Sequence, residues 1–291
     1  MNIYSAEGIK DILKSSNLFL SKSRGQNYLK DESVAQKISK SITENTSDPS
    51  KVSVIEVGSG IGSLTVQLSK YFNKIASFEI DKGIFSCFSK TLEEYNIKNV
   101  IPLHKDFLKF NLNEIQKILN VTEGNETIFV SNLPYSVGGE ILKRVFYEMH
   151  YVSKIFVMIQ KEFFERITAI PGSKNYSYLS VIYQLETKQI QKIMDIPKNH
   201  FFPTPSVDSV FVYIEKSENK TSESEREIIK TLFSTKRKTI FKSLKLYMKN
   251  QKKPDTIIEE ILRTLGIPQN ERIEKLPPDT LLKLSRLIKI S

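Results

Sequence analysis

The 291-residue sequence predicts an α/β fold, with a doubly wound, Rossmann-like sheet followed by a small C-terminal all-helical domain. Between residues 51 and 215, short apolar runs rich in β-branched residues alternate with helical patterns, which is typical of a parallel sheet with crossover helices. Residues 216–226 contain no apolar side chain, and the apolar residues beyond them recur at helical spacing. The expected domains are therefore 1–215 and 227–291, joined by a linker at 216–226.

The individual elements follow from the same patterns. Strands are predicted at 52–57, 75–78, 100–103, 127–130, 154–159 and 207–214. Helices are predicted at 63–71, 84–95, 140–147 and 161–167, and in the C-terminal region at 228–233, 239–248, 256–265 and 280–288. Ligands of a doubly wound sheet bind beyond the carboxyl ends of its strands. Residues that directly follow a predicted strand are therefore the candidates for a functional site.

The composition narrows the class of protein. Hydrophobic residues make up 40% of the chain, enough for a buried core, so wholesale disorder is excluded. The formal net charge of +10 favours polyanionic partners, nucleic acid first and an anionic membrane second. Cys87 is the only cysteine, which excludes an intramolecular disulfide, and no structural metal is expected. Without a signal-peptide pattern or a membrane-spanning apolar run, the cytoplasm is the expected location.

A glycine-rich turn follows the first predicted strand. Gly58, Gly60 and Gly62 alternate with Ser59 and Ile61 and precede a helical pattern. Glycines let the backbone turn tightly and approach a ligand closely, and a strand, glycine turn and helix in this order are typical of a nucleotide-type cofactor site. NAD enzymes, methyltransferases and purely structural turns share this pattern, so the turn alone does not separate them.

Two carboxylates follow the next two strands. Glu79 lies about 20 residues beyond the glycines, where a carboxylate accepts hydrogen bonds from both ribose hydroxyls of an adenosine in NAD and in S-adenosylmethionine alike. Asp106 follows the third strand, where it can accept a hydrogen bond from an adenine amine. NAD folds use a carboxylate there less often, so Asp106 favours a methyltransferase.

A tetrad directly follows the fourth strand and consists of Asn132, Leu133, Pro134 and Tyr135. The lone pair of adenine N6 is delocalised into the ring, which makes the amine a poor nucleophile. The Asn132 side-chain oxygen and the backbone carbonyl of Leu133 or Pro134 can accept both amine protons and favour a more nucleophilic geometry. Pro134 stiffens the backbone, and Tyr135 offers a ring on which an extruded base can stack. The tetrad therefore predicts a site that holds an adenine amine for methylation.

Taken together, these motifs resemble the kasugamycin-resistance type of rRNA adenine dimethyltransferase, and the resemblance runs through nearly the whole chain. Arg24-Gly25-Gln26-Asn27-Tyr28-Leu29 is similar to the N-terminal cofactor-binding signature of that family. Further matching segments lie at 78–81, 105–107, 132–135, 158–162, 165–166, 171–174, 179–181, 201–205, 207–209 and 233–239. Departures are Ser59, where proline is common, and Ser136-Val137-Gly138, where the family often has Asn-Ile-Ser; both leave the tetrad intact.

The resemblance implies a reaction and a role for each matching residue. It implies methyl transfer from S-adenosylmethionine to N6 of two adjacent adenines in a 3′-terminal loop of 16S rRNA, on the immature small ribosomal subunit, by a monomer. The implied cofactor residues are Asn27, Leu29 (through its backbone), Gly58, Glu79, Asp106 and Asn132. The implied catalytic residues are Asn132, Leu133, Pro134, Tyr135 and Phe201, with Phe201 stacking on the target base opposite Tyr135 and Phe202 as the alternative.

A basic segment in the helical domain is the expected RNA-binding surface. Residues 235–253 contain eight Lys and Arg side chains and no acidic one, with an apolar stripe at helical spacing. Such a helix can present charge to phosphates, although a membrane-surface helix has the same pattern. RNA is favoured because the tetrad already requires a nucleic-acid base.

Two other functions compete with the small-subunit enzyme. One is a large-subunit rRNA adenine methyltransferase of the macrolide-resistance type, which shares the glycine turn and an Asn-x-Pro-Tyr tetrad; the segments at 160–162 and 171–174 favour the small-subunit type. The other is a non-catalytic RNA-binding assembly factor on the same scaffold, which the intact Glu79, Asp106 and Asn132 speak against. An NAD-linked dehydrogenase gives no reason for the tetrad.

Overall fold

The computed structural model describes residues 2–16, 18, 26–121, 125–218, 220–249 and 254–290. The chain forms two compact units. The first unit comprises Met1–Lys161 and Gln191–Lys216, and the second comprises Glu162–Ile190 and Ser217–Ser291. No helix in the described ranges is long and apolar enough to cross a membrane.

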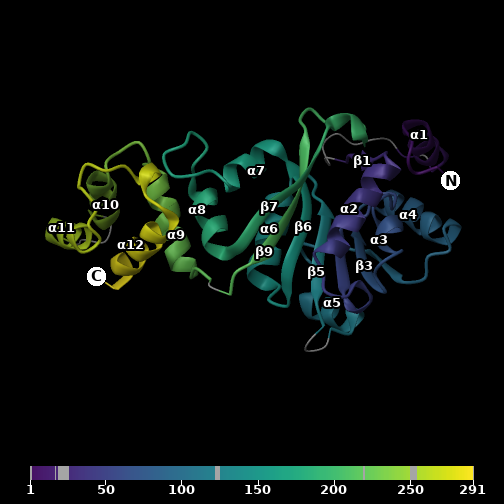
Figure 1. Ribbon diagram of the computed structural model, residues 1–291, viewed down its shortest axis with the longest axis horizontal. Coiled ribbons are helices and arrows are strands. Elements are labelled where there is room, and N and C mark those ends of the chain that lie inside the picture. The colour runs from purple at the N-terminus through teal and green to yellow at the C-terminus, as the bar shows by residue number, and fades with distance from the viewer. Residues whose placement is uncertain are drawn as a thin grey trace. The chain divides into compact units, whose positions relative to one another are not determined.

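A seven-stranded sheet has the strand order β4-β3-β2-β5-β6-β9-β7. Figure 1 labels five of these strands, namely β3, β5, β6, β7 and β9. The strands of the sheet are β2 (Ser53–Val57), β3 (Lys74–Glu79), β4 (Val100–His104), β5 (Thr127–Asn132), β6 (Val152–Gln160), β7 (Thr187–Ile196) and β9 (Ser209–Lys216). The first five are parallel, and β9 runs antiparallel to β6. The six predicted strands are confirmed. Strand β7 is an additional strand that was not predicted, because most of its residues are partly or fully exposed.

The strand order reverses at β2, which pairs with β3 on one side and β5 on the other. Val57, at the carboxyl end of β2, lies opposite Phe78 and Ser131. All five residues of β2 are buried, because helices cover both faces of such a sheet. Crossovers leaving β2 and its neighbours diverge at this reversal and leave a crevice at the carboxyl ends, where the glycine turn and the tetrad begin.

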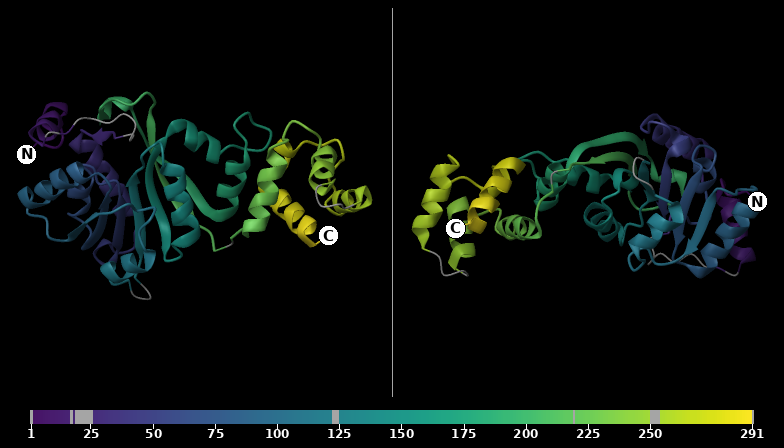
Figure 2. Two further views of the ribbon diagram at one scale, coloured as in Figure 1. Left: turned by 180° about the vertical axis from the view of Figure 1, so that it is seen from behind. Right: turned by 90° about the horizontal axis from the view of Figure 1, so that it is seen from below.

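Helices of the first unit lie over both faces of the sheet: α2 lies over one face in Figure 1, and the view from behind in Figure 2 shows α6 over the other. The helices of this unit are α1 (Ala6–Ser15), which packs against α4, α2 (Glu32–Glu44), α3 (Thr65–Leu68), α4 (Lys82–Glu94), α5 (Leu112–Leu119) and α6 (Gly138–Glu148). The predicted helix at 63–71 is shorter than expected. Asn99 Nδ2 donates to the carbonyls of Ser69 (2.8 Å) and Phe72 (2.6 Å), which diverts that segment from a regular helix.

The second unit is helical and has its own apolar core. It contains α7 (Lys161–Ile167, of which Lys161 belongs to the first unit), α8 (Tyr178–Glu186), α9 (Glu223–Phe233), α10 (Ile240–Lys249), α11 (Asp255–Thr264) and α12 (Pro278–Ile290). Its four C-terminal helices were all predicted. Fully buried Ile229, Leu244 and Leu284 come from three of them and pack in one cluster with Tyr176, whose hydroxyl donates to the Leu276 carbonyl at 2.8 Å.

The boundary between the units differs from the expected linker. Strand β9 continues to Lys216, which is buried because its ammonium donates to the carbonyls of Val145 and Met149 at the end of α6. Helix α9 already begins at Glu223, after a capping box formed by Ser222 and Glu225. In addition, residues 162–190 cluster with the C-terminal helices, although the sequence placed them in the first domain. Composition alone does not reveal these contacts, because the carbonyls that accept from Lys216 are distant from it in the sequence.

Candidate active site

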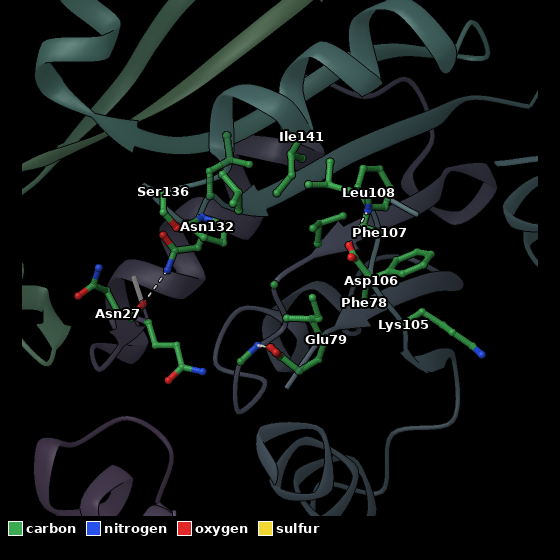
Figure 3. Close-up of a pocket in the computed structure, with 18 of the residues that line it drawn as sticks. Asn27, Phe78, Glu79, Lys105, Asp106, Phe107, Leu108, Asn132, Ser136 and Ile141 are labelled. Atoms are coloured by element: carbon green, nitrogen blue, oxygen red, sulfur yellow. Dashed lines mark hydrogen bonds between the residues drawn. The ribbon is translucent and has the colours of Figure 1, made fainter. Parts of the chain in front are cut away.

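A cavity of about 510 Å³ opens at the carboxyl ends of the central strands in the first unit (Figure 3). It is lined by residues 26–28, the glycine turn, residues 78–80 and 105–108, and Ile141 of α6. Asn132, Leu133 and Pro134 of the tetrad also line it, with Ser136 and Val137, whereas Tyr135 does not. Asn27, Gly58, Glu79, Asp106 and Asn132, which the sequence predicted as cofactor residues, all line this cavity. The size is that of a site for one small molecule.

The glycine turn keeps one wall of the cavity thin. Gly58 and Gly60 have φ angles of +79° and +56°, in the left-handed region where a side chain strains the backbone. The Gly58 amide donates to the Phe78 carbonyl at 2.9 Å, which ties the turn to β3. A Cβ on Gly58 would stand 3.7 Å from the backbone oxygen of Asn132. That distance is ordinary van der Waals contact, so the glycine turn lies close to the tetrad with no side chain between Gly58 and Asn132.

Glu79 is held at the end of β3 by two backbone amides. Its carboxylate accepts hydrogen bonds from Gly60 N (3.0 Å) and Asp81 N (2.9 Å), and only 7% of the residue is exposed. Burial raises the pKa of Glu79 to about 7, against these backbone hydrogen bonds, which lower it. A carboxylate so oriented can accept two ligand hydroxyls, and it does so best when it is ionised.

Asp106 lies after β4, in a turn that its own side chain stabilises. Its Oδ1 accepts a hydrogen bond from Leu108 N at 2.9 Å, and Lys109 Nζ lies 3.8 Å from Oδ2. Figure 3 shows Glu79 and Asp106 facing the cavity from neighbouring strand ends. The donor set of S-adenosylmethionine, ribose hydroxyls and an adenine amine, matches these two acceptors, and the glycine turn leaves room beside them. The residues present therefore fit that cofactor.

Asn132 is the last residue of β5, and its orientation is set by the N-terminal signature. Its Nδ2 donates to the backbone carbonyl of Asn27 at 2.8 Å (Figure 3). Because Nδ2 donates this bond, the side-chain amide is oriented with Nδ2 towards Asn27 and with the acceptor Oδ1 on its other branch. This bond between residues 105 positions apart was not predicted from the sequence.

The backbone of the tetrad distinguishes its two carbonyls. The Pro134 carbonyl already accepts the amides of Val137 (3.2 Å) and Gly138 (2.8 Å), which start α6. The Leu133 amide donates to Met158 on β6 at 3.2 Å, and the Leu133 side chain is buried. Of the two carbonyls that the sequence left open, that of Leu133 is therefore the better acceptor for an incoming amine.

Tyr135 is fixed by its hydroxyl and keeps a partly exposed ring. Its Oη lies 2.7 Å from Ser209 Oγ at the start of β9. Burial raises the pKa of Tyr135, against the hydrogen bond to Ser209, which lowers it. The hydroxyl is thus a neutral anchor, and the ring is the part of Tyr135 that can meet a base.

Phe201 does not match its expected role. It has no exposed surface, packs in the core and pairs with Leu29 between the short strands β1 (Tyr28–Leu29) and β8 (Phe201–Phe202). A base cannot reach its ring without displacing this packing, so the buried position of Phe201 argues against the expected stacking on the target base. The alternative, Phe202, is partly exposed, with Lys10 Nζ 5.5 Å from its ring centroid.

The N-terminal signature is only partly seen. Arg24 and Gly25 lie outside the described residues, whereas Gln26, Asn27 and Tyr28 line the cavity. Leu29 is buried and lies behind the glycine turn rather than in the cavity wall. Tyr28 and Ile80 were not singled out from the sequence. Their neighbours Asn27 and Glu79 were singled out, and adjacency to these residues is the signal that could have found Tyr28 and Ile80.

The fold and this set of residues define the class of S-adenosylmethionine-dependent methyltransferases. The family model described as ribosomal RNA adenine dimethylase matches residues 19–289, and the chain belongs to this family. It is 34% identical over 284 residues to the ribosomal RNA small subunit methyltransferase A of Bacillus pumilus, covering 96% of this chain and 94% of the relative. The relative of the same name in Bacillus cytotoxicus has the same identity and coverage.

Two solved structures share the fold. A dimethyladenosine transferase from Plasmodium falciparum has a TM-score of 0.71 at 24% identity, over 88% of this chain and 95% of that one. The 23S rRNA methyltransferase ErmE has a TM-score of 0.62 at 19% identity, over 90% of this chain and 99% of that one. At these identities the likeness supports the fold, and the reaction class comes from the family: this chain is an S-adenosylmethionine-dependent rRNA adenine methyltransferase.

Proposed function

We propose that the protein transfers methyl groups to N6 of two adjacent adenines in a 3′-terminal loop of 16S rRNA, during biogenesis of the small ribosomal subunit. The names of the two Bacillus relatives support the choice of the small subunit. The observation that carries the chemistry is the Asn132 amide, anchored on the Asn27 carbonyl beside Gly58 at the cavity wall.

The cofactor bed is formed by residues on three strand ends. Glu79 accepts the ribose hydroxyls and Asp106 the adenine amine, while Asn27 and Gly58 border the methionine portion. When bound, S-adenosylmethionine supplies an electrophilic methyl group on a positively charged sulfur. Gly58 borders Asn132 at this end of the bed, with no side chain between them.

The tetrad prepares the target amine. Asn132 Oδ1 and the Leu133 carbonyl accept its two protons, which localises the N6 lone pair toward the methyl group. The new N–C bond forms as the S–C bond breaks, and the amine then releases one proton to solvent. Tyr135 stacks on one face of the extruded base, and Phe202 is the phenylalanine proposed for the other. No strong general base is required.

The position of the modified adenines tests this function. Immature small and large subunits are each incubated with the protein and S-adenosylmethionine, and methylated nucleotides are mapped by mass spectrometry. We expect dimethyladenosine at two adjacent positions near the 3′ end of small-subunit rRNA and none in large-subunit rRNA. Methylation confined to large-subunit RNA would favour the macrolide-resistance reaction instead.

The second unit carries the proposed RNA contact. Lys236, Arg237 and Lys238 lie between α9 and α10, where Arg237 and Lys238 are exposed. Reversing all three charges to glutamate should weaken RNA binding and reduce the slope of log affinity against log salt by up to about 3, because each lost phosphate contact removes roughly one released counterion. Filter binding or fluorescence anisotropy across a salt series measures both quantities.

A matched charge reversal separates this contact from the loss of net positive charge. Lys37, Lys40 and Lys90 are exposed on α2 and α4 and give the same change in net charge. Their reversal should shift the salt slope less than reversal of the 236–238 set. Equal slopes for the two triple variants would remove residues 236–238 from the binding surface. Residues 250–253 of the predicted basic segment lie outside the described residues.

The setting of the reaction is part of the same proposal. The enzyme acts as a monomer in the cytoplasm, on small subunits that are still immature. Its positive net charge of +10 supports association with rRNA rather than with a neutral partner.

A further inference from the structure

The loop after β4 must be held in place for Asp106 to face the cavity. Within residues 105–110, the hydrogen bond from Leu108 N to Asp106 Oδ1 is local and shapes only one turn. Farther along, the rings of Phe107 and Phe110 pack edge-on against Phe78, with centroid separations of 5.4 and 5.3 Å. This aromatic packing fixes the floor of the loop but leaves its backbone carbonyls to be satisfied elsewhere.

Arg144 on α6 meets those carbonyls. Its two terminal nitrogens donate to the carbonyls of Phe107 and Phe110, the second at 2.6 Å. The guanidinium carbon also lies 5.6 Å from the centroid of the Phe107 ring, and only 12% of the side chain is exposed. A planar fork can span two carbonyls at once, which a single ammonium does less well.

The same helix begins at the tetrad. The Pro134 carbonyl accepts the first amides of α6, and Ile141, one turn before Arg144, lines the cavity (Figure 3). Helix α6 therefore contacts the tetrad through its first turn and the Asp106 loop through Arg144. The two sides of the cavity are connected through one rigid element.

We propose that Arg144 is a positioning residue for the adenine end of the cofactor, acting by clamping the loop that carries Asp106. It does not line the cavity, so its effect passes through Asp106. The inference rests on the proposed role of Asp106 in accepting the adenine amine. If Arg144 had a purely structural role, that role would come from its ion pair with Glu148 (3.1 Å). The Glu148 side chain is 57% exposed, so this ion pair contributes little to stability.

The test compares binding of S-adenosylhomocysteine with binding of its analogue in which an oxo group replaces the adenine 6-amino group. Calorimetry measures both affinities for the full-length protein. The wild type should prefer the amino form by about tenfold or more, because a hydrogen bond to a carboxylate is lost with the oxo form. Asp106→Ala should remove this preference, and Arg144→Ala should reduce it at least threefold. Adding Arg144→Ala to Asp106→Ala should cause no further change in the preference.

Matched variants separate positioning from folding. Glu148→Ala removes the carboxylate partner of Arg144 and should keep the full preference. Arg144→Lys keeps the charge and should give an intermediate preference, and it carries the test if Arg144→Ala unfolds in thermal denaturation. An unchanged preference in both Arg144 variants, with loss in Asp106→Ala, overturns this inference alone. An unchanged preference in Asp106→Ala overturns the adenine contact proposed for Asp106.

Discussion

Replacing Asn132 by alanine should reduce the methylation rate at saturating substrates by about 100- to 1,000-fold, as for other single groups that stabilise a transition state. The variant loses Oδ1, which accepts a proton of the target amine, and the Nδ2 bond to Asn27 that orients it. Cofactor affinity should change much less, because Glu79 and Asp106 are retained. Single-turnover methyl transfer to immature small subunits measures the rate, and calorimetry measures the affinity.

A control on the same strand tests whether the loss is specific. Thr127 begins β5, and its buried hydroxyl has no hydrogen-bond partner among the residues that the structure describes. Thr127→Val keeps the side-chain shape, so both stability and methyl transfer should stay near wild type. Near-normal turnover by the Asn132→Ala variant would refute the amine-holding mechanism.

The second large effect concerns Glu79 and pH. The pKa of Glu79 is about 7, so the fraction of ionised carboxylate falls as the pH is lowered from 8 to 6. Ribose hydroxyls need the ionised acceptor, and binding should weaken over this range by at most about tenfold per pH unit, the limit for one linked proton. Glu79→Gln should bind the cofactor about 10- to 100-fold more weakly at pH 8, since hydrogen bonds to a charged group are lost.

Glu79→Gln should weaken cofactor binding, but it should increase the stability of the free protein. Because the folded-state pKa of Glu79 is raised, its contribution to stability is fully present at low pH and is lost as the pH rises through about 7. Glu79→Gln should therefore stabilise the free protein above pH 7, by at most about 3 kcal/mol. Calorimetry at pH 6 and 8 measures the cofactor affinity, and denaturant titrations at the same pH values measure the free energy of unfolding. Any pH dependence that comes from titration of the cofactor itself should also appear in the Glu79→Gln variant, which therefore serves as the control. Identical pH profiles for the two proteins would contradict the assignment.

The elements predicted from sequence are those with strong local patterns. Buried strands such as β2 and β5 contain short runs of apolar, β-branched residues, and the helices of the second unit have apolar residues at helical spacing. Strand β7 was missed because most of its residues are partly or fully exposed, so no apolar run marks it. Helix α8 was missed because it follows the irregular segment at 168–177, and its packing against the C-terminal helices is decided by tertiary contacts.

The sequence predicted those residues of the candidate site that lie at or directly after the carboxyl end of a strand. Glu79, Asp106 and Asn132 are each at or just beyond a strand end, so the rule that ligands bind at carboxyl ends brought them together. Phe201 failed because a family-like motif does not reveal which of two adjacent aromatic rings points inward. In a strand, neighbouring side chains face opposite ways, and pairing of β8 with β1 turned Phe201 into the core.

The sequence by itself determined the doubly wound sheet, the glycine turn, the carboxylates and the tetrad, because each depends on residue types at short separations along the chain. Only the tertiary structure decided which groups meet across long separations: Asn27 with Asn132, Arg144 with the loop of Asp106, and Lys216 with the end of α6. These contacts depend on the packing of helices and strands distant in sequence. Periodicity describes which side of an element is buried, but not which distant group it meets there.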